Sequence, residues 1–151
     1  MIRKRTTRLT SRALAALAFA AMTLRPAIAA DPSGTWLTEA GTSRIRIADC
    51  GGVLCGNIVW MKEPIDPDTG KPRADKNNPD AAKRNRPLMG VTIVIGMKPS
   101  GADKWSGQVY NAEDGKTYSG SITMVSAGAL KLEGCALAGL ICKAQTWTRV
   151  N

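Results

Sequence analysis

Short runs of alternating polar and apolar residues, separated by turn-forming residues, cover the chain after residue 33. Alternation places every second side chain on the same face, which is typical of half-buried strands. Gly-Gly and Asp-Gly between the runs supply the left-handed positions that tight hairpins need. The pattern predicts eight strands, over residues 34–39, 43–50, 54–61, 90–98, 104–111, 116–125, 128–135 and 142–150.

Eight consecutive antiparallel strands with one apolar face favour a closed barrel, because an open sheet would leave two long unpaired edges. We therefore predict an all-β fold, an eight-stranded antiparallel up-and-down barrel. The alternative is a two-sheet sandwich with a solid core. Arg44, Arg46 and Lys131 are expected to point outward. The residues expected inside are Trp36, Ile45, Ile47, Ile58, Trp60, Val109, Tyr118, Ile122, Met124, Leu130 and Leu132.

The connection over residues 62–88, between the third and fourth strands, departs from this pattern and contains five prolines. A structureless loop of that length is uncommon in a compact domain and is often functional. Residues 78–84 predict a short helix, with Asn78 as its cap and Pro79 at the first position. Its basic cluster either meets an anionic ligand group or is simply solvated. The cluster consists of Lys83, Arg84 and Arg86.

A different pattern occupies the N-terminus. Basic residues precede an unbroken apolar run over residues 13–24, and Ala27-Ile28-Ala29 follows. This arrangement predicts a cleavable signal peptide over residues 1–29 and a single domain over residues 30–151. A membrane-spanning helix is the alternative, but it needs about 20 apolar residues, and this run stops earlier. The mature form is expected to be periplasmic or secreted, with no membrane span.

The net charge of +9 belongs mostly to this leader. Six of the 21 Lys+Arg residues lie in it, and none of the 12 Asp+Glu residues does. The remaining fifteen basic and twelve acidic residues leave the mature chain at only +3. So small a charge gives little electrostatic attraction to phosphates, and we predict no nucleic-acid partner.

All four cysteines lie in the predicted mature part. An even number in an exported chain predicts disulfides, for which three pairings exist. Pairing Cys50 with Cys55 and Cys135 with Cys142 is favoured, because each pair brackets a glycine-containing turn between two strand-like runs. A four-cysteine zinc site is the rival, but its ligand pairs are usually closer together and it needs free thiolates. We predict no metal and no cofactor.

Several ordered motifs resemble the bacterial exported family known as domain of unknown function 2147. They are GTWLTE, DCGGVLCG, NIVWMKEP, NNPDAAKRNRPLMG, EDGKTYSG and the closing GC…ICKAQTWTRV, which together extend from Gly34 to Val150. The resemblance implies an extracytoplasmic, lipocalin-like barrel and no particular reaction or ligand.

A looser resemblance fits the same fold. Lipocalins and their relatives open the first strand with Gly-x-Trp and place a basic residue of the last strand over the indole. Gly34-Thr35-Trp36 and Arg149 occupy matching places. A cation over an indole contributes about 0.5 to 2 kcal/mol while closing the barrel end. The resemblance implies a structural role for Trp36 and Arg149.

Two hypotheses for function follow. The first is a carrier or sensor that holds a small apolar or amphipathic molecule inside the barrel, with the 62–88 connection as a lid. The second is a cell-envelope module that binds a protein or glycan through its surface and basic loop. An enzyme is not expected, because the chain has no histidine, nucleophile elbow or phosphate loop. The ligand-contact residues predicted for the first hypothesis are Trp60, Tyr118, Met124, Arg84 and Arg86.

Overall fold

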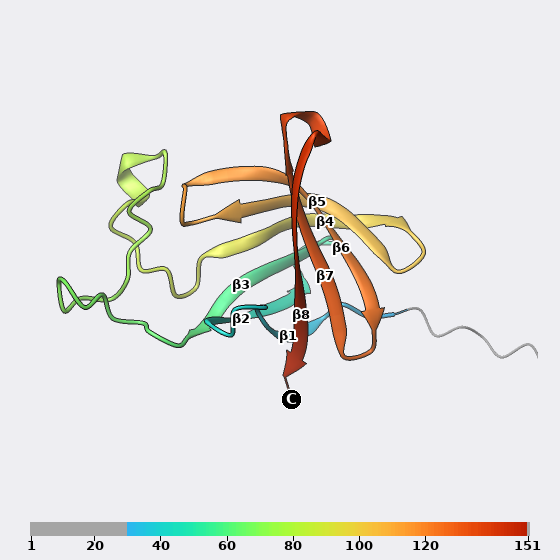
Figure 1. Ribbon diagram of the computed structural model, residues 1–151, viewed down its shortest axis with the longest axis horizontal. Coiled ribbons are helices and arrows are strands. Elements are labelled where there is room, and N and C mark those ends of the chain that lie inside the picture. The colour runs from blue at the N-terminus through green and yellow to red at the C-terminus, as the bar shows by residue number, and fades with distance from the viewer. Residues whose placement is uncertain (1–29, 151) are drawn as a thin grey trace, which may run out of the picture.

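The computed structural model describes residues 30–150, which form a closed barrel of eight antiparallel strands in chain order (Figure 1). Each strand pairs with the next, and the last pairs with the first, so the barrel has no free edge. This confirms the predicted barrel and excludes the sandwich. The predicted signal peptide lies outside the described residues. The strands are β1 (Gly34–Leu37), β2 (Ser43–Asp49), β3 (Leu54–Met61), β4 (Thr92–Gly101), β5 (Lys104–Asn111), β6 (Lys116–Ser126), β7 (Ala129–Ala136) and β8 (Ile141–Val150).

The core lies inside the barrel and is formed mostly by alternate residues of the strands. Most of the predicted inward residues are buried there, whereas Arg44 and Arg46 are exposed on the outer face. The sequence pattern missed Val94 and Met97 of β4, because the consecutive apolar residues 93–95 give no alternation that would show which side chain faces inward. The core consists of Trp36, Ile45, Ile47, Ile58, Val91, Val94, Met97, Tyr110, Ile122, Met124, Leu130, Leu132 and Trp147.

A β-bulge changes the orientation of Trp60. Ile45 pairs with Ile58 while Arg44 pairs with Trp60, so β3 carries one extra residue here. Trp60 is half-buried beside the exposed Arg44, whose guanidinium carbon lies 4.7 Å from the centre of the indole. Met61 takes the inward position instead. The predicted inward placement of Trp60 is wrong, because one inserted residue moves every following side chain to the other face.

Trp36 and Arg149 close one end of the barrel. They are opposite each other in the β1–β8 register, and the guanidinium carbon lies 4.2 Å from the indole centre. A Cβ on Gly34 would collide with the guanidinium, and the φ of +133° at Gly34 also favours glycine. These contacts explain physically why Gly-x-Trp accompanies the arginine. The guanidinium also donates to the backbone carbonyls of Asp31, Ser33 and Ala127.

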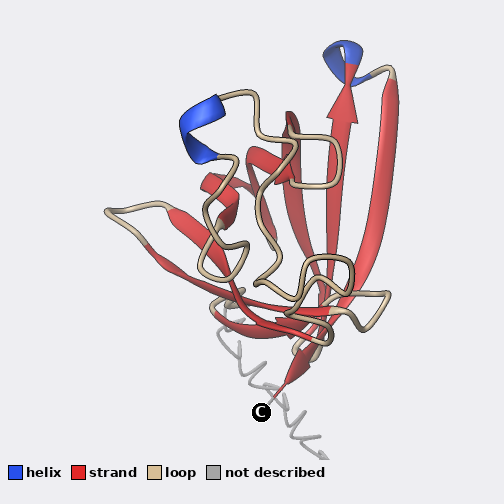
Figure 2. Ribbon diagram, turned by 90° about the vertical axis from the view of Figure 1, so that its left-hand side faces the viewer, coloured by secondary structure: helices blue, strands red, loops and turns tan. Residues whose placement is uncertain are grey.

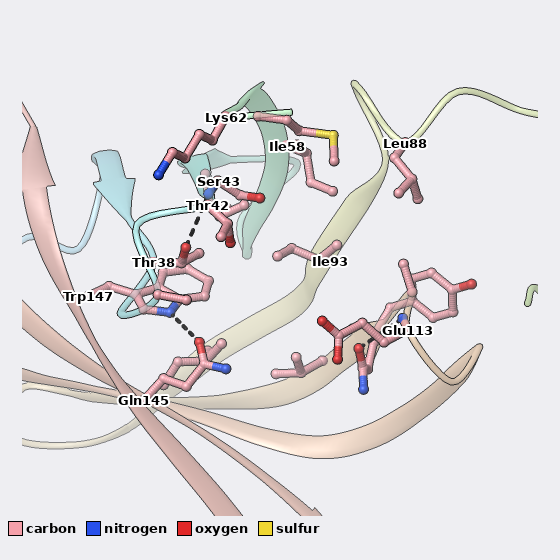
Figure 3. A pocket seen from close by; sticks show the side chains of 18 of the residues that line it. Thr38, Thr42, Ser43, Ile58, Lys62, Leu88, Ile93, Glu113, Gln145 and Trp147 are labelled. Carbon is pink, nitrogen blue, oxygen red and sulfur yellow. Dashed lines mark hydrogen bonds between the residues drawn. The ribbon is translucent and has the colours of Figure 1, made fainter. Parts of the chain in front are cut away.

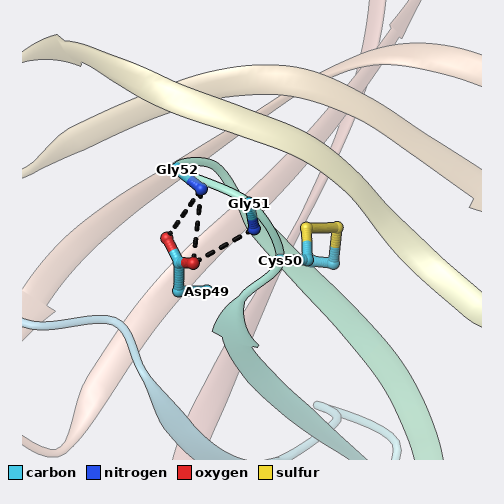
Figure 4. The surroundings of a disulfide bond; sticks show 5 residues. Asp49, Cys50, Gly51 and Gly52 are labelled. Carbon is cyan, nitrogen blue, oxygen red and sulfur yellow. Dashed lines mark hydrogen bonds between the residues drawn. A yellow bond between two sulfur atoms is a disulfide. The ribbon is translucent and has the colours of Figure 1, made fainter.

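Both disulfides cross-link hairpins. Cys50 is joined to Cys55 across the β2–β3 turn, and Cys135 is joined to Cys142 between β7 and β8. This is the pairing that the sequence favours. In the first turn, the Asp49 carboxylate accepts hydrogen bonds from two glycine amides (Figure 4). The described residues contain no free cysteine, so they offer no thiolate set for zinc.

The connection between β3 and β4, residues 62–91 and called the long loop below, folds back on itself (Figure 2). Isolated β-bridges join Ile65 to Pro72 and Ala74 to Pro87, which divides the loop into two successive turns. The backbone of the long loop is therefore ordered by these bridges rather than by helices.

No helix in residues 30–150 has the length and hydropathy needed to cross a bilayer.

The helix of the long loop is a single 3-10 turn, η1 (Ala81–Lys83). Its N-cap is Asp80, whose carboxylate accepts a hydrogen bond from the backbone N–H of Ala82. The prediction of Asn78 as the cap is wrong. The side chain of Asn78 is buried, and its amide nitrogen donates to Asp75 instead. A second 3-10 turn, η2 (Leu137–Gly139), joins β7 to β8.

Candidate ligand-binding cavity

A cavity of about 580 Å³ lies at the end of the barrel opposite the Trp36–Arg149 closure. Figure 3 shows side chains that line it. Its walls come from the ends of the strands, the β1–β2 turn, the long loop and the β5–β6 turn. Small-molecule sites typically have volumes of roughly 300–1,000 Å³. The barrel is therefore not filled completely by its own side chains, and the space at its mouth is large enough for a small molecule.

The inner wall of the cavity is apolar because five strands each direct an alternate residue towards it. Trp147 is the largest of these side chains and is 1% exposed. Its indole N–H donates to the Gln145 side chain at 3.0 Å, so the ring has a satisfied polar edge and a fixed position. The wall residues are Ile45, Ile58, Ile93, Leu132 and Trp147.

The rim of the cavity is polar. Thr38 and Ser43 contribute hydroxyls, and Lys62 and Glu113 lie on opposite sides of the space (Figure 3). Among residues 30–150, neither Lys62 nor Glu113 has an ion-pair partner. Glu63 and Arg73, which also line the mouth, form an ion pair with each other at 3.2 Å. The charges available to a ligand are thus those of Lys62 and Glu113.

A buried carboxylate attaches the long loop to the barrel. Asp75 is 0% exposed and accepts a hydrogen bond from the Tyr110 hydroxyl of β5 at 2.5 Å. Asn78 donates to Asp75 at 2.7 Å and to the Tyr110 oxygen at 3.1 Å. Arg86 adds two bonds, from Nε at 2.9 Å and from Nη2 at 2.8 Å. These four side chains, called the Asp75 cluster below, satisfy one another's buried polar atoms.

The Asp75 cluster holds its carboxylate ionised. Burial alone would raise the pKa of Asp75, but the hydrogen bonds from Tyr110, Asn78 and Arg86 outweigh it and lower the pKa below its usual value. Burial and the adjacent carboxylate raise the pKa of Tyr110. At neutral pH the pair is therefore a phenol donating to a carboxylate, which is a strong charge-assisted bond.

A second contact fixes the long loop against the β5–β6 turn. The side-chain amide of Asn77 donates to the backbone carbonyl of Glu113 at 2.7 Å. A Cβ on Gly115 would collide with the Asn77 carbonyl, and the φ of Gly115 is +70°. Only glycine allows this close approach. The loop is thus held on the side of the cavity where Glu113 and Tyr110 lie.

None of the residues predicted from the sequence to contact a ligand lines this cavity. Trp60 lies on the outer face of β3. The Tyr118 hydroxyl donates to the Asp114 carboxylate in the preceding turn. Met124 is buried, and its backbone N–H bonds to Asp103 of the β4–β5 turn, near the closed end.

The two predicted arginines donate within the long loop instead. The Arg84 guanidinium bonds to the carbonyls of Asn78 and Pro79. Arg86 bonds to the buried Asp75. Of the predicted basic cluster, Lys83 pairs with Asp80 at 3.3 Å. All three cations therefore have partners inside the loop, and their contacts stabilise its shape.

Sequence reasoning missed Asp75 and Tyr110. Asp75 lies among many loop acids, and nothing in its neighbourhood distinguishes it. Tyr110 follows Val109 in β5, and the sequence pattern predicts Val109 as the inward residue. Val109 does line the cavity, so both neighbours contribute to this end of the barrel.

Comparisons with known proteins agree with this architecture. The model of the family described as "Uncharacterized protein conserved in bacteria (DUF2147)" matches residues 34–149. Among solved structures, the chain is similar to protein HP1028 from the human pathogen Helicobacter pylori, which is described as belonging to the lipocalin family. The identity is 26%, the TM-score is 0.67, and the match covers 80% of this chain and 84% of that one. No curated protein matches. With a family match over nearly all of its described residues, the chain belongs to the domain of unknown function 2147 family and has a lipocalin-like fold.

Proposed function

We propose that this protein binds a small apolar or amphipathic molecule in the cavity at the mouth of its barrel. The observation that carries the proposal is the cavity of about 580 Å³, with its apolar wall and its polar, partly charged rim. Such a combination suits a ligand whose body leaves water while its polar group stays at the rim. The similarity to a protein described as a lipocalin supports the same function.

The rim narrows the chemistry of the ligand. An apolar body would pack on Leu132 and Trp147, and an acidic group would meet Lys62 beside the hydroxyls of Thr38 and Ser43. Lys62 is exposed and has no acidic partner among the described residues, so its ammonium is available to such a group. An amphipathic acid can therefore contact both the apolar wall and the polar rim of the cavity, whereas a purely apolar molecule can contact only the wall favourably.

The proposed place of action is outside the cytoplasm. The leader pattern of residues 1–29 and the two disulfides of the barrel both support export. The mature protein would then be one domain over residues 30–151. Within this domain the proposed function is binding rather than catalysis, since the chain has no histidine and the Asp75 carboxylate has no exposed surface.

The alternative, a cell-envelope module that binds a protein or glycan through its basic loop, has less support. It relies on free cations in the long loop, and Arg84 and Arg86 both donate to partners inside that loop. The cavity, in contrast, offers unpaired rim groups over an apolar wall.

A fluorescent-dye experiment tests the proposal. Anilinonaphthalene sulfonate carries an acidic group, whereas N-phenylnaphthylamine is neutral. We expect Ile93→Trp, which places an indole in the cavity, to weaken binding of both dyes about tenfold. Lys62→Gln should weaken only the sulfonate. Both are read by fluorescence titration.

Ile65→Trp is the matched control, because Ile65 is 49% exposed on the long loop and does not line the cavity. It should bind both dyes as the unmodified protein does. Equal dye binding by the Ile93→Trp variant and the unmodified protein would place the dye elsewhere and contradict the proposal.

A further inference from the structure

The β7–β8 hairpin ends in an apolar tip. Residues 135–142 read CALAGLIC and contain no charged side chain. Leu137 is 66% exposed, Leu140 83% and Ile141 56%. The hairpin stands well clear of the rest of the barrel, at the top of Figure 1 and the upper right of Figure 2. Three large aliphatic side chains are thus displayed together in water, and such grouped exposure marks an interaction surface.

The tip is cross-linked at its base. The Cys135–Cys142 disulfide closes its base, Ala136 pairs with Ile141, and the Leu140 N–H donates to the Leu137 carbonyl. Leu137 has a φ of +49°, which is costly for a side chain of this size. The disulfide and the hairpin pairing therefore hold the tip in one shape, and a preformed apolar projection needs little ordering when it binds.

We propose that the apolar tip inserts into the surface of a lipid bilayer. The tip projects from the barrel, so a lipid surface can reach all three of its exposed side chains. It also lacks the Trp, Tyr and Arg side chains that dominate protein–protein contacts. Binding at a lipid interface scales with the apolar area that is buried, and exposed leucine and isoleucine side chains supply such area.

The charges around the base of the tip fit an anionic lipid surface. Lys143 directly follows the disulfide and is exposed, and within residues 30–150 it has no acidic partner. Lys131 and Glu133 of β7 pair with each other at 3.5 Å. Lys143 therefore places a positive charge directly beside the tip, where lipid phosphates would lie, while the acid Glu39 contacts β8 three residues further from the tip, at Thr146.

The position of the tip relates it to the cavity. Strand direction puts the β7–β8 connection at the same end of the barrel as the cavity mouth, and Gln145 and Trp147 of β8 line the cavity. A bilayer held by the tip would lie at the end where a ligand enters. The contact with lipid does not depend on an occupied cavity, so it can be tested independently of the proposed function.

Vesicle flotation tests the inference. Protein recovered after export, with its N-terminus established by mass, is mixed with vesicles of phosphatidylethanolamine and phosphatidylglycerol. We expect it to float with the vesicles, and the combined change Leu137→Asn, Leu140→Ser and Ile141→Thr to lower the bound fraction at least about tenfold. These side chains are mostly exposed, so the barrel should fold unchanged, as checked by thermal unfolding. Lys143→Gln should weaken binding to these vesicles but not to vesicles of phosphatidylcholine.

Val125→Thr is the matched control. Val125 is 64% exposed near the β6–β7 turn, at the closed end of the barrel, and its change should leave flotation unaltered.

Leu140→Trp serves as a probe of insertion depth. Its emission should shift to the blue with vesicles and should be quenched by brominated lipid chains. Failure of the unmodified protein to float, or equal floating of the tip variant, would overturn the inference. Concentration-dependent dimers that the tip variant abolishes, without flotation, would assign the tip to a second copy instead.

Discussion

The two ends of the barrel are organised by an arginine and an aromatic ring, but in different ways. At the closed end, Arg149 lies on Trp36 and donates to backbone carbonyls. At the open end, Arg86 reaches the Tyr110 hydroxyl only through the shared, buried carboxylate of Asp75. The closed end uses acceptors that never titrate. The open end relies on a group that changes its charge with pH.

The two ends of the barrel should therefore contribute differently to stability. The closed end joins the first and last strands, so its loss opens the barrel itself. The Asp75 cluster joins a loop to one strand, so its loss can release the loop while the strand pairing persists. We therefore expect global effects from changes at the closed end and local effects from changes at the open end.

The largest effect should come from Trp36→Ala. Removal of a fully buried indole should cost about 3–5 kcal/mol of unfolding free energy, measured by chemical denaturation. Trp60→Ala is the matched control, since Trp60 lies outside and contacts Arg44, and it should cost only about 1 kcal/mol. Equal losses for the two variants would contradict the assignment of Trp36 to the core and Trp60 to the surface.

Asp75→Asn should have a smaller and more local effect. An amide cannot accept from Tyr110, Asn78 and Arg86 together, and loss of the partners of a buried polar group costs about 1–3 kcal/mol. Hydrogen exchange should become faster in residues 62–91 while the strands keep their protection. Asp68→Asn, an exposed acid on the same loop, should change nothing. Uniformly faster exchange in Asp75→Asn would show that the loop and barrel unfold as one unit.

The smallest effect is the dependence on pH. The lowered pKa of Asp75 means that its contribution is present above the unfolded value of about 3.9 and is lost as pH falls through the folded value. The difference in unfolding free energy between the unmodified protein and Asp75→Asn should therefore be constant near neutral pH and shrink below about pH 4. A difference that persists unchanged at pH 2 would assign it to packing instead of charge.

Much of the fold was predictable because its signals are local. Alternation fixes the strands, and the turns Gly51-Gly52 and Asp114-Gly115 mark the hairpins. The bulge before Trp60 was not predictable, since an inserted residue leaves no trace in a sequence that stays apolar on both sides. One such insertion was enough to place a predicted ligand contact on the outer surface.

The candidate site was less predictable because its contacts are distant in sequence. Asp75 and Tyr110 lie 35 residues apart, and neither has a local pattern that indicates the other. Arg86 looked available to a ligand because its acidic partner is 11 residues away, in a loop with several other acids. The charge of a loop can be read from sequence, but the pairing of its charges depends on the fold.

The arrangement of the disulfides also affects how the chain can be oxidised. The first cysteine is joined to the second and the third to the fourth, over sequence separations of 5 and 7. Each of these bonds closes a short loop within its own hairpin, whereas any other pairing must close a loop of many dozens of residues at a higher entropic cost. The two bonds can therefore form one after the other in chain order, with one two-electron oxidation each, and correct pairing should not require a disulfide isomerase.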